Sequence, residues 1–199
     1  MSAPESEPES ETPEGLILVS NESAAVSQLD MAIELWFTDR DPISIHTLAW
    51  ASLQLAHDLG SKQGKPSDLI TNILKLPKKQ RARSGLVTAI GKHADRRFAD
   101  HNAVEYPPGM TEDVIFEAIC CCRKVFDDLT PWMRVFSAWY VANYPELFKE
   151  MPRRSLIERL GGGEYLAGLS RREFAQEVVP ILSREDFWFS PPSKEPGQM

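Results

Sequence analysis

Apolar side chains recur at helical spacing along almost the whole chain, and the strict alternation that is typical of strands is almost absent. Between residues 22 and 38 they fall three or four residues apart, on one face of a helix: Val26, Leu29, Ile33 and Trp36. This periodicity leaves little sequence from which a sheet could form. The pattern predicts an all-α fold.

Local capping signals set the boundaries of the predicted helices. Asp41 precedes Pro42, an N-cap acid with proline at the first helical position, and Thr130 with Pro131 marks the restart of the chain before a further helix. Ser170 and a glutamate three residues later predict a capping box. The expected helices span approximately residues 22–38, 42–59, 66–76, 78–94, 111–129, 131–144 and 170–182.

Three further signals organise the chain. Gly60 is expected to end the second helix as its C′ glycine, Thr111 to cap the fifth, and the glycines at 161–163 to break the chain. Together these signals predict an antiparallel bundle of five to six helices with a short helical C-terminal extension. The predicted parts are a bundle domain over 20–148, an extension over 149–190 and a flexible tail over 191–199.

The first fifteen residues differ in composition from everything that follows. They carry five glutamates with proline and serine and no large apolar residue between Met1 and Leu16, so we expect a disordered acidic leader over residues 1–15. Removing those five acids from the net charge of -7 leaves -2 for the remainder. The body of the protein is therefore nearly neutral.

Cysteine usage and hydropathy point to a cytoplasmic protein. Cys120, Cys121 and Cys122 are consecutive, so on a helix they point about 100° apart and cannot converge on one metal ion. We interpret them as small, reduced core residues. The N-terminus lacks the pattern of a secretory signal, and no apolar run approaches the roughly 20 residues that span a bilayer. We expect no metal, no cofactor and no membrane partner.

Residues 75–97 hold the strongest local charge, with eight lysines or arginines and a single acid. Such a run predicts a face that binds an anionic partner such as RNA, or alternatively a solvated helix face paired with acids of the same chain. The candidate anion-binding residues are Lys78, Lys79, Arg81, Arg83 and Lys92. The candidate catalytic residues are His93, His101, Arg96 and Arg97. An imidazole could transfer a proton, and the guanidinium groups could stabilise the charge of a phosphate.

Other patterns have a structural and a functional interpretation. His46 is either a core histidine or a secondary site residue with Arg40, and we favour the core. His57 and Asp58 form the His-Asp dipeptide found in metal-dependent phosphohydrolases, but the sequence lacks further histidine and aspartate ligands at a suitable spacing from them. The aromatic residues of the helix at 131–144 favour core packing over base stacking.

Three segments, in order, carry a resemblance to a known family. They are LDMAIELWFTDRDPISIHTLAWASLQLAHDL, IGKHADRR and LTPWMRVFSAWYVANYPE, which together cover roughly residues 28–147. In this order they resemble a family of uncharacterised bacterial all-helical proteins. That resemblance implies an all-helical fold and confers no activity.

A more distant resemblance is to the HEPN superfamily, whose members include RNA-cleaving toxins and defence proteins. Their signature is an arginine and a histidine separated by four to six residues, which Arg40 with His46 and Arg96 with His101 both match. Two functions therefore stay open. One is an interaction or regulatory module that binds a protein partner or its own copy, and the other is a HEPN-like, metal-independent RNA-binding or RNA-cleaving protein.

Overall fold

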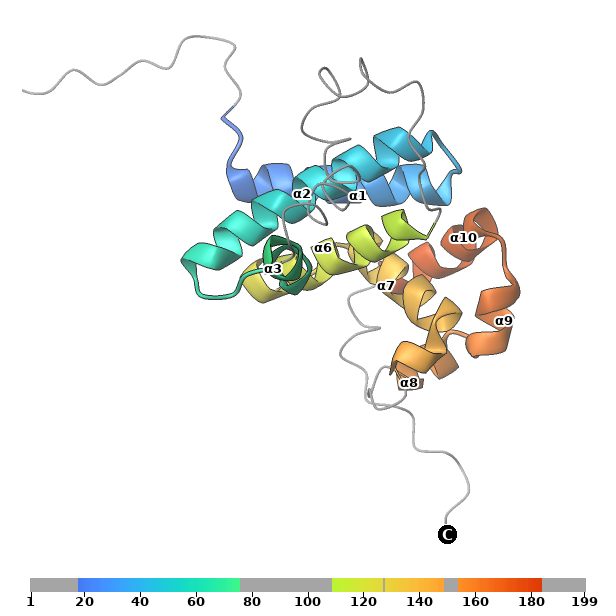
Figure 1. Cartoon of the computed structure of the whole chain (residues 1–199). Helices are drawn as coiled ribbons and strands as arrows, with labels where there is room; N and C mark the ends of the chain where they lie inside the picture. Colours follow the sequence, from blue (N-terminus) through green and yellow to red (C-terminus); the bar gives the residue numbers. More distant parts are fainter. Residues whose placement is uncertain (1–17, 76–108, 127, 149–153, 184–199) are drawn as a thin grey trace, which may run out of the picture.

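The computed structural model describes residues 18–75, 109–126, 128–148 and 154–183. Within these ranges the regular structure is helical, without strands, and comprises eight α-helices and one 3-10 helix (Figure 1). The all-α prediction is confirmed. The leader, most of the basic run and the tail lie outside the described residues.

The first two helices form a hairpin. Helix α1 (Asn21–Phe37) and helix α2 (Pro42–Lys62) pack side by side, and the N-caps are Ser20 and the predicted Asp41 (Figure 1). The buried hydroxyl of Ser52 donates a hydrogen bond of 2.7 Å to the carbonyl of Ala25, which fixes the two helices against each other.

Helix α2 does not end at Gly60, so that prediction was wrong. The helix continues to Lys62, and the glycine with a left-handed backbone is Gly64, at φ +73°. Gly60 is required for another reason: a Cβ atom there would lie 2.3 Å from the carbonyl oxygen of Lys65. The chain that leaves α2 returns too close to the helix for any side chain at this position.

Helix α3 (Asp68–Lys75) begins two residues later than predicted, because Ser67 rather than Pro66 starts it. The hydroxyl of Ser67 accepts a hydrogen bond from the backbone N–H of Ile70 at 3.2 Å. The same hydroxyl donates to Glu117 of helix α6 (Met110–Phe126) at 2.8 Å, so the cap also docks α3 onto α6.

Thr111 is the second residue of α6 and not its cap, which corrects a further prediction. Its side chain is buried against α2 instead, where its hydroxyl lies within hydrogen-bonding distance of the His46 imidazole. From the sequence alone, a threonine before an apolar run looks the same whether it caps the helix or lies inside its first turn. Only the packing against another helix distinguishes the two positions.

Helix α7 (Pro131–Asn143) carries the aromatic core, and the short 3-10 helix η1 (Pro145–Phe148) follows it. α7 begins at Pro131 as predicted, and Thr130 caps it and also donates to Asp30 of α1 at 2.5 Å. Phe136 is fully buried, and the ring of Trp139 lies 4.3 Å from that of Trp36, centroid to centroid. The aromatic residues of α7 thus pack in the core, as we favoured from the sequence.

The C-terminal helices pack into the same hydrophobic core. They are α8 (Arg154–Arg159), α9 (Gly163–Gly168) and α10 (Arg171–Leu182), and the predicted capping box opens α10. The ring of Phe174 is fully buried and stacks on Phe37 of α1 with centroids 6.1 Å apart. α10 runs through Pro180 to its end two residues later. The C-terminal segment is helical as predicted and completes the core of the first helices.

None of the described helices is long and apolar enough to cross a membrane.

Candidate functional site

The predicted catalytic and anion-binding residues lie outside the described part of the chain. This applies to His93, His101, Arg96 and Arg97, and to Lys78, Lys79, Arg81, Arg83 and Lys92. The RNA-cleaving function that they suggested therefore stays a prediction.

The two secondary candidates occupy different environments. His46 is fully buried, with its Nδ1 atom 3.3 Å from the hydroxyl of Thr111. Arg40 is exposed in the turn before α2, and its backbone N–H donates to the carbonyl of Leu35 at 3.0 Å. His46 thus lies in the core, the position that we favoured from the sequence.

His57 stabilises the end of α2. Its Nδ1 atom accepts a hydrogen bond from the backbone N–H of Ser67 at 3.0 Å, and its Nε2 atom lies 3.4 Å from the hydroxyl of Ser61. Both ring nitrogens therefore have protein partners. Among the described residues, no group of histidine, cysteine or acidic side chains could hold a metal ion.

The cysteines have the character of core residues. Cys121 and Cys122 are buried and Cys120 is half-buried, and all three are free thiols. Burial, reinforced by neighbouring negative charge, raises the thiol pKa of Cys121 and of Cys122 to about 12. At neutral pH these two thiols stay protonated and are poor nucleophiles.

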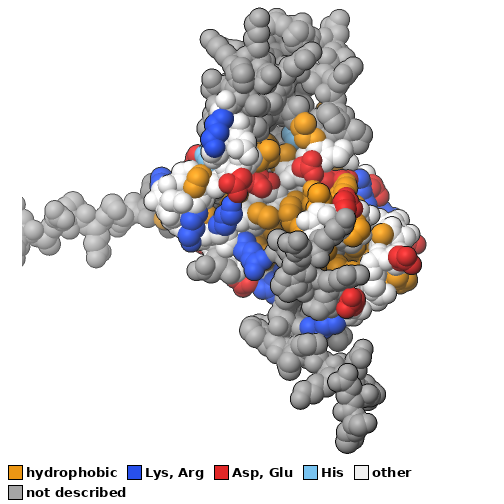
Figure 2. Space-filling model, turned by 60° about the horizontal axis from the view of Figure 1, so that its bottom comes forward, with side chains coloured by type: hydrophobic (Ala, Val, Ile, Leu, Met, Phe, Trp, Pro, Cys, Tyr) orange, Lys and Arg blue, Asp and Glu red, His pale blue; other side chains and the backbone are white. Residues whose placement is uncertain are grey.

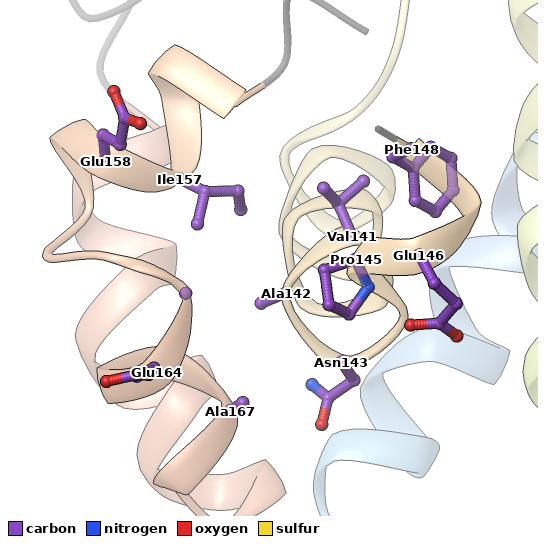
Figure 3. A pocket seen from close by; sticks show the side chains of 11 residues that line it. Val141, Ala142, Asn143, Pro145, Glu146, Phe148, Ile157, Glu158, Glu164 and Ala167 are labelled. Carbon is purple, nitrogen blue, oxygen red and sulfur yellow. The ribbon is translucent and has the colours of Figure 1, made fainter. Parts of the chain in front are cut away.

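A groove lies between the end of α7 with η1 on one side and α8 with α9 on the other (Figure 3). Its volume is about 740 Å³, within the range of ligand pockets. We call it the α7–α9 groove. Its lining residues are Val141, Ala142, Asn143, Pro145, Glu146, Phe148, Ile157, Glu158, Gly163, Glu164 and Ala167.

The centre of the groove is apolar. Ile157 of α8 points across it toward Val141 of α7, and the methyl groups of Ala142 and Ala167 lie further along its two walls (Figure 3). Glu146, Glu158 and Glu164 also line it, and the carboxylates of Glu158 and Glu164 point away from the gap between the two walls (Figure 3). The lining is therefore chiefly apolar.

The glycines at 161–163 shape the far wall. Gly161 and Gly162 have φ of +112° and +95°, values that side-chain-bearing residues avoid, and they reverse the chain between α8 and α9. Leu160 and Leu166 on either side of the reversal are buried in the core. The two short helices are therefore anchored in the core, and Ile157, Gly163 and Ala167 line the groove.

A cluster around Arg171 attaches α10 to the rest of the fold. Its guanidinium lies 4.1 Å from the centre of the Trp36 ring and 3.2 Å from the carboxylate of Glu112. That carboxylate also accepts a hydrogen bond of 2.5 Å from the hydroxyl of Tyr144. This bond, with burial, raises the phenol pKa of Tyr144 to about 12. α1, α6, α7 and α10 meet at this cluster.

Charge is unevenly distributed over the face shown in Figure 2. Lysines and arginines gather along one side of a central apolar area, and acidic side chains lie nearer its centre and opposite side (Figure 2). The described lining of the α7–α9 groove contains three glutamates and no lysine or arginine.

Comparisons with protein-family models, curated proteins and solved structures gave no match.

Proposed function

We propose that this protein is an interaction module that binds an apolar, helical segment of a protein partner in the α7–α9 groove. The observation that carries the proposal is the groove itself, a concavity with a chiefly apolar lining between helices of the described structure. Grooves of this type accept an amphipathic helix, which inserts apolar side chains spaced three and four residues apart.

The composition of the lining favours binding. Its polar side chains are Asn143 and three glutamates, and it includes no serine, cysteine, lysine or histidine that could act as a nucleophile. The amide of Asn143 donates to the carbonyl of Trp139 at 2.9 Å, so it is engaged with its own helix. What the groove offers a ligand is chiefly apolar surface.

The test uses a defined probe, a fluorescent amphipathic peptide about five helical turns long, with leucines on one face and glutamines on the other. Ala167→Trp places a large side chain at the wall of the groove from an exposed position on α9. Gln176→Trp adds the same side chain at an exposed position of α10 that does not line the groove. Circular dichroism verifies that both variants fold.

Fluorescence anisotropy should show saturable binding to the wild-type protein and the Gln176→Trp variant. The Ala167→Trp variant should bind at least about tenfold more weakly, a difference of about 1.4 kcal/mol. Equal affinity for all three proteins, or no binding by any of them, would refute the proposal.

A further inference from the structure

We infer that His57 is a pH-sensitive switch for helix α3. The neutral imidazole holds the start of α3 against α2, and the protonated imidazole lets α3 detach from the bundle. The inference is independent of the α7–α9 groove. It follows from which ring nitrogen accepts a hydrogen bond, from how the bonded residue is connected to α3 and α6, and from the shortness of α3.

The hydrogen bond that His57 makes to the connection between α2 and α3 requires a neutral ring. Its Nδ1 atom accepts from the backbone N–H of Ser67 at 3.0 Å, so the proton of the neutral ring lies on Nε2, 3.4 Å from the hydroxyl of Ser61. Protonation places a hydrogen on Nδ1 as well, and both ring nitrogens are then donors. Two N–H groups would face each other, and the bond to Ser67 would be lost.

Ser67 links this bond to α3, because its hydroxyl and its carbonyl are bonded there too. The hydroxyl accepts from the backbone N–H of Ile70 at 3.2 Å and donates to Glu117 of α6 at 2.8 Å. The carbonyl accepts from the hydroxyl of Thr71 at 2.6 Å. Ser67 is fully buried, so its N–H has no water to bond when the imidazole stops accepting. Protonation therefore leaves an unsatisfied donor at the start of α3, which is relieved when this turn opens.

Helix α3 is too short to be stable alone. It spans 8 residues, and isolated helices shorter than about 12–15 residues are marginal in water. Leu69 and Ile70, the apolar side chains described in it, are only half-buried against the core. Its docking therefore depends on polar bonds, namely those of Ser67 and the bond from the backbone N–H of Leu69 to Glu117 at 3.2 Å.

The charged and titratable groups on the elements around His57 form no ion pair with it among the described residues. They are Asp58 and Lys62 of α2, Lys65 of the connection, Asp68 and Lys75 of α3, and Glu117, Cys121 and Lys124 of α6. Lys124 pairs with Asp68 at 3.1 Å, and the amine of Lys65 donates to the carbonyl of Lys124 at 2.8 Å. In this arrangement, protonation of His57 removes a hydrogen bond without adding an ion pair.

The experiment measures hydrogen exchange of the backbone amides by NMR in the whole 199-residue chain. The two conditions are about pH 7.5 and about pH 5.5, between which a histidine changes charge and ordinary carboxylates stay ionised. The matched control is His57→Asn, because the Oδ1 atom of asparagine can accept at the place of Nδ1 and does not titrate. A second variant, His57→Phe, keeps a ring and removes the acceptor.

In the wild-type protein, the protection factors of the Ser67 and Leu69 amides should fall at least about fivefold from the higher to the lower pH. The His57→Asn variant should keep its protection at both pH values, and the His57→Phe variant should lack it at both. The amide of Ala118, in the core of α6, should stay protected throughout.

Two results would overturn the inference. One is equal protection of Ser67 and Leu69 in the wild-type protein at the two pH values, whatever the variants do. The other is an undiminished loss at the lower pH in the His57→Asn variant. That variant retains the buried His46, so such a loss would assign the pH effect to a group other than His57.

Discussion

Replacement of Arg171 by alanine should destabilise the protein far more than loss of an ordinary surface arginine. Arg171 is the first residue of α10, and its guanidinium contacts three other parts of the fold. Its Nη2 atom lies 3.2 Å from Glu112 and its Nη1 atom 3.5 Å from Asp39. The guanidinium also lies over the ring of Trp36. The Glu112 side chain is only 10% exposed, so its carboxylate depends on this partner.

The magnitude follows from the separate contacts. A partly desolvated cation–π contact contributes about 0.5–2 kcal/mol, and a hydrogen bond to a charged group about 1.5–3 kcal/mol. The pair with Asp39 is exposed and adds less than about 1 kcal/mol. Because the Arg171 side chain is 39% exposed, water screens part of each interaction, and the lower values apply. We expect a loss of about 2–3 kcal/mol in the free energy of unfolding.

The assay is urea unfolding followed by tryptophan fluorescence, with Arg172→Ala as the matched control. Arg172 is the adjacent residue of α10 and is exposed, so its replacement should change stability by less than about 0.5 kcal/mol. A double-mutant cycle with Glu112→Gln should show coupling of about 1 kcal/mol or more. Equal effects of the two arginine substitutions would refute the role assigned to this cluster.

Three further predictions concern the fold. Phe174→Ala should cost about 3–5 kcal/mol in urea unfolding, because it empties a fully buried site in the shared core; a loss below about 1 kcal/mol would contradict a joint core. Gly60→Ala should cost about 1–3 kcal/mol by steric overlap, whereas Gly168→Ala, with open space around it, should be neutral or stabilising; the reverse order would contradict the close approach. Finally, the phenol pKa of Tyr144 is raised from 10.0 to about 12, so the folded state retains its proton at a pH where the unfolded state loses it. The stability that this group contributes is present below about pH 10 and is lost as the pH rises toward 12. Tyr144→Phe should therefore reduce the loss of unfolding free energy between these two pH values. An unchanged profile of stability against pH would contradict the raised pKa.

Helix starts could be predicted from the sequence because their chemistry is local. Asp41 and Thr130 each precede a proline, and Ser170 pairs with Glu173 within the same turn. A cap of this kind requires only residues that are neighbours in the chain, so no knowledge of the tertiary structure is needed.

Contacts between distant residues could not be predicted in the same way. Glu112 and Arg171 lie 59 positions apart, and neither belongs to a motif. A glycine such as Gly60 is typical of a helix end, but this position requires glycine because the backbone of Lys65 returns close to its Cα atom. Such requirements become visible only when the helices are packed.

The groove also escaped prediction from the sequence. The residues that line it have no regular spacing, and four separate helical elements, α7, η1, α8 and α9, contribute them. The usable signals were the glycines at 161–163 and the proline that follows α7, since both interrupt helices at the edges of the groove. They indicate where the chain turns but do not predict that a groove forms between the helices on either side.

The most direct test of the central claim is a methyl NMR titration of this 199-residue chain with the amphipathic peptide that carries leucines on one face and glutamines on the other. The account predicts saturable shifts of the methyl signals of Val141, Ala142, Ile157 and Ala167, which line the groove. The methyl signal of Ala118, buried in the core, should stay unchanged. Shifts confined to methyl groups outside the groove, or no shifts at saturating peptide, would contradict the claim that the α7–α9 groove is the binding site.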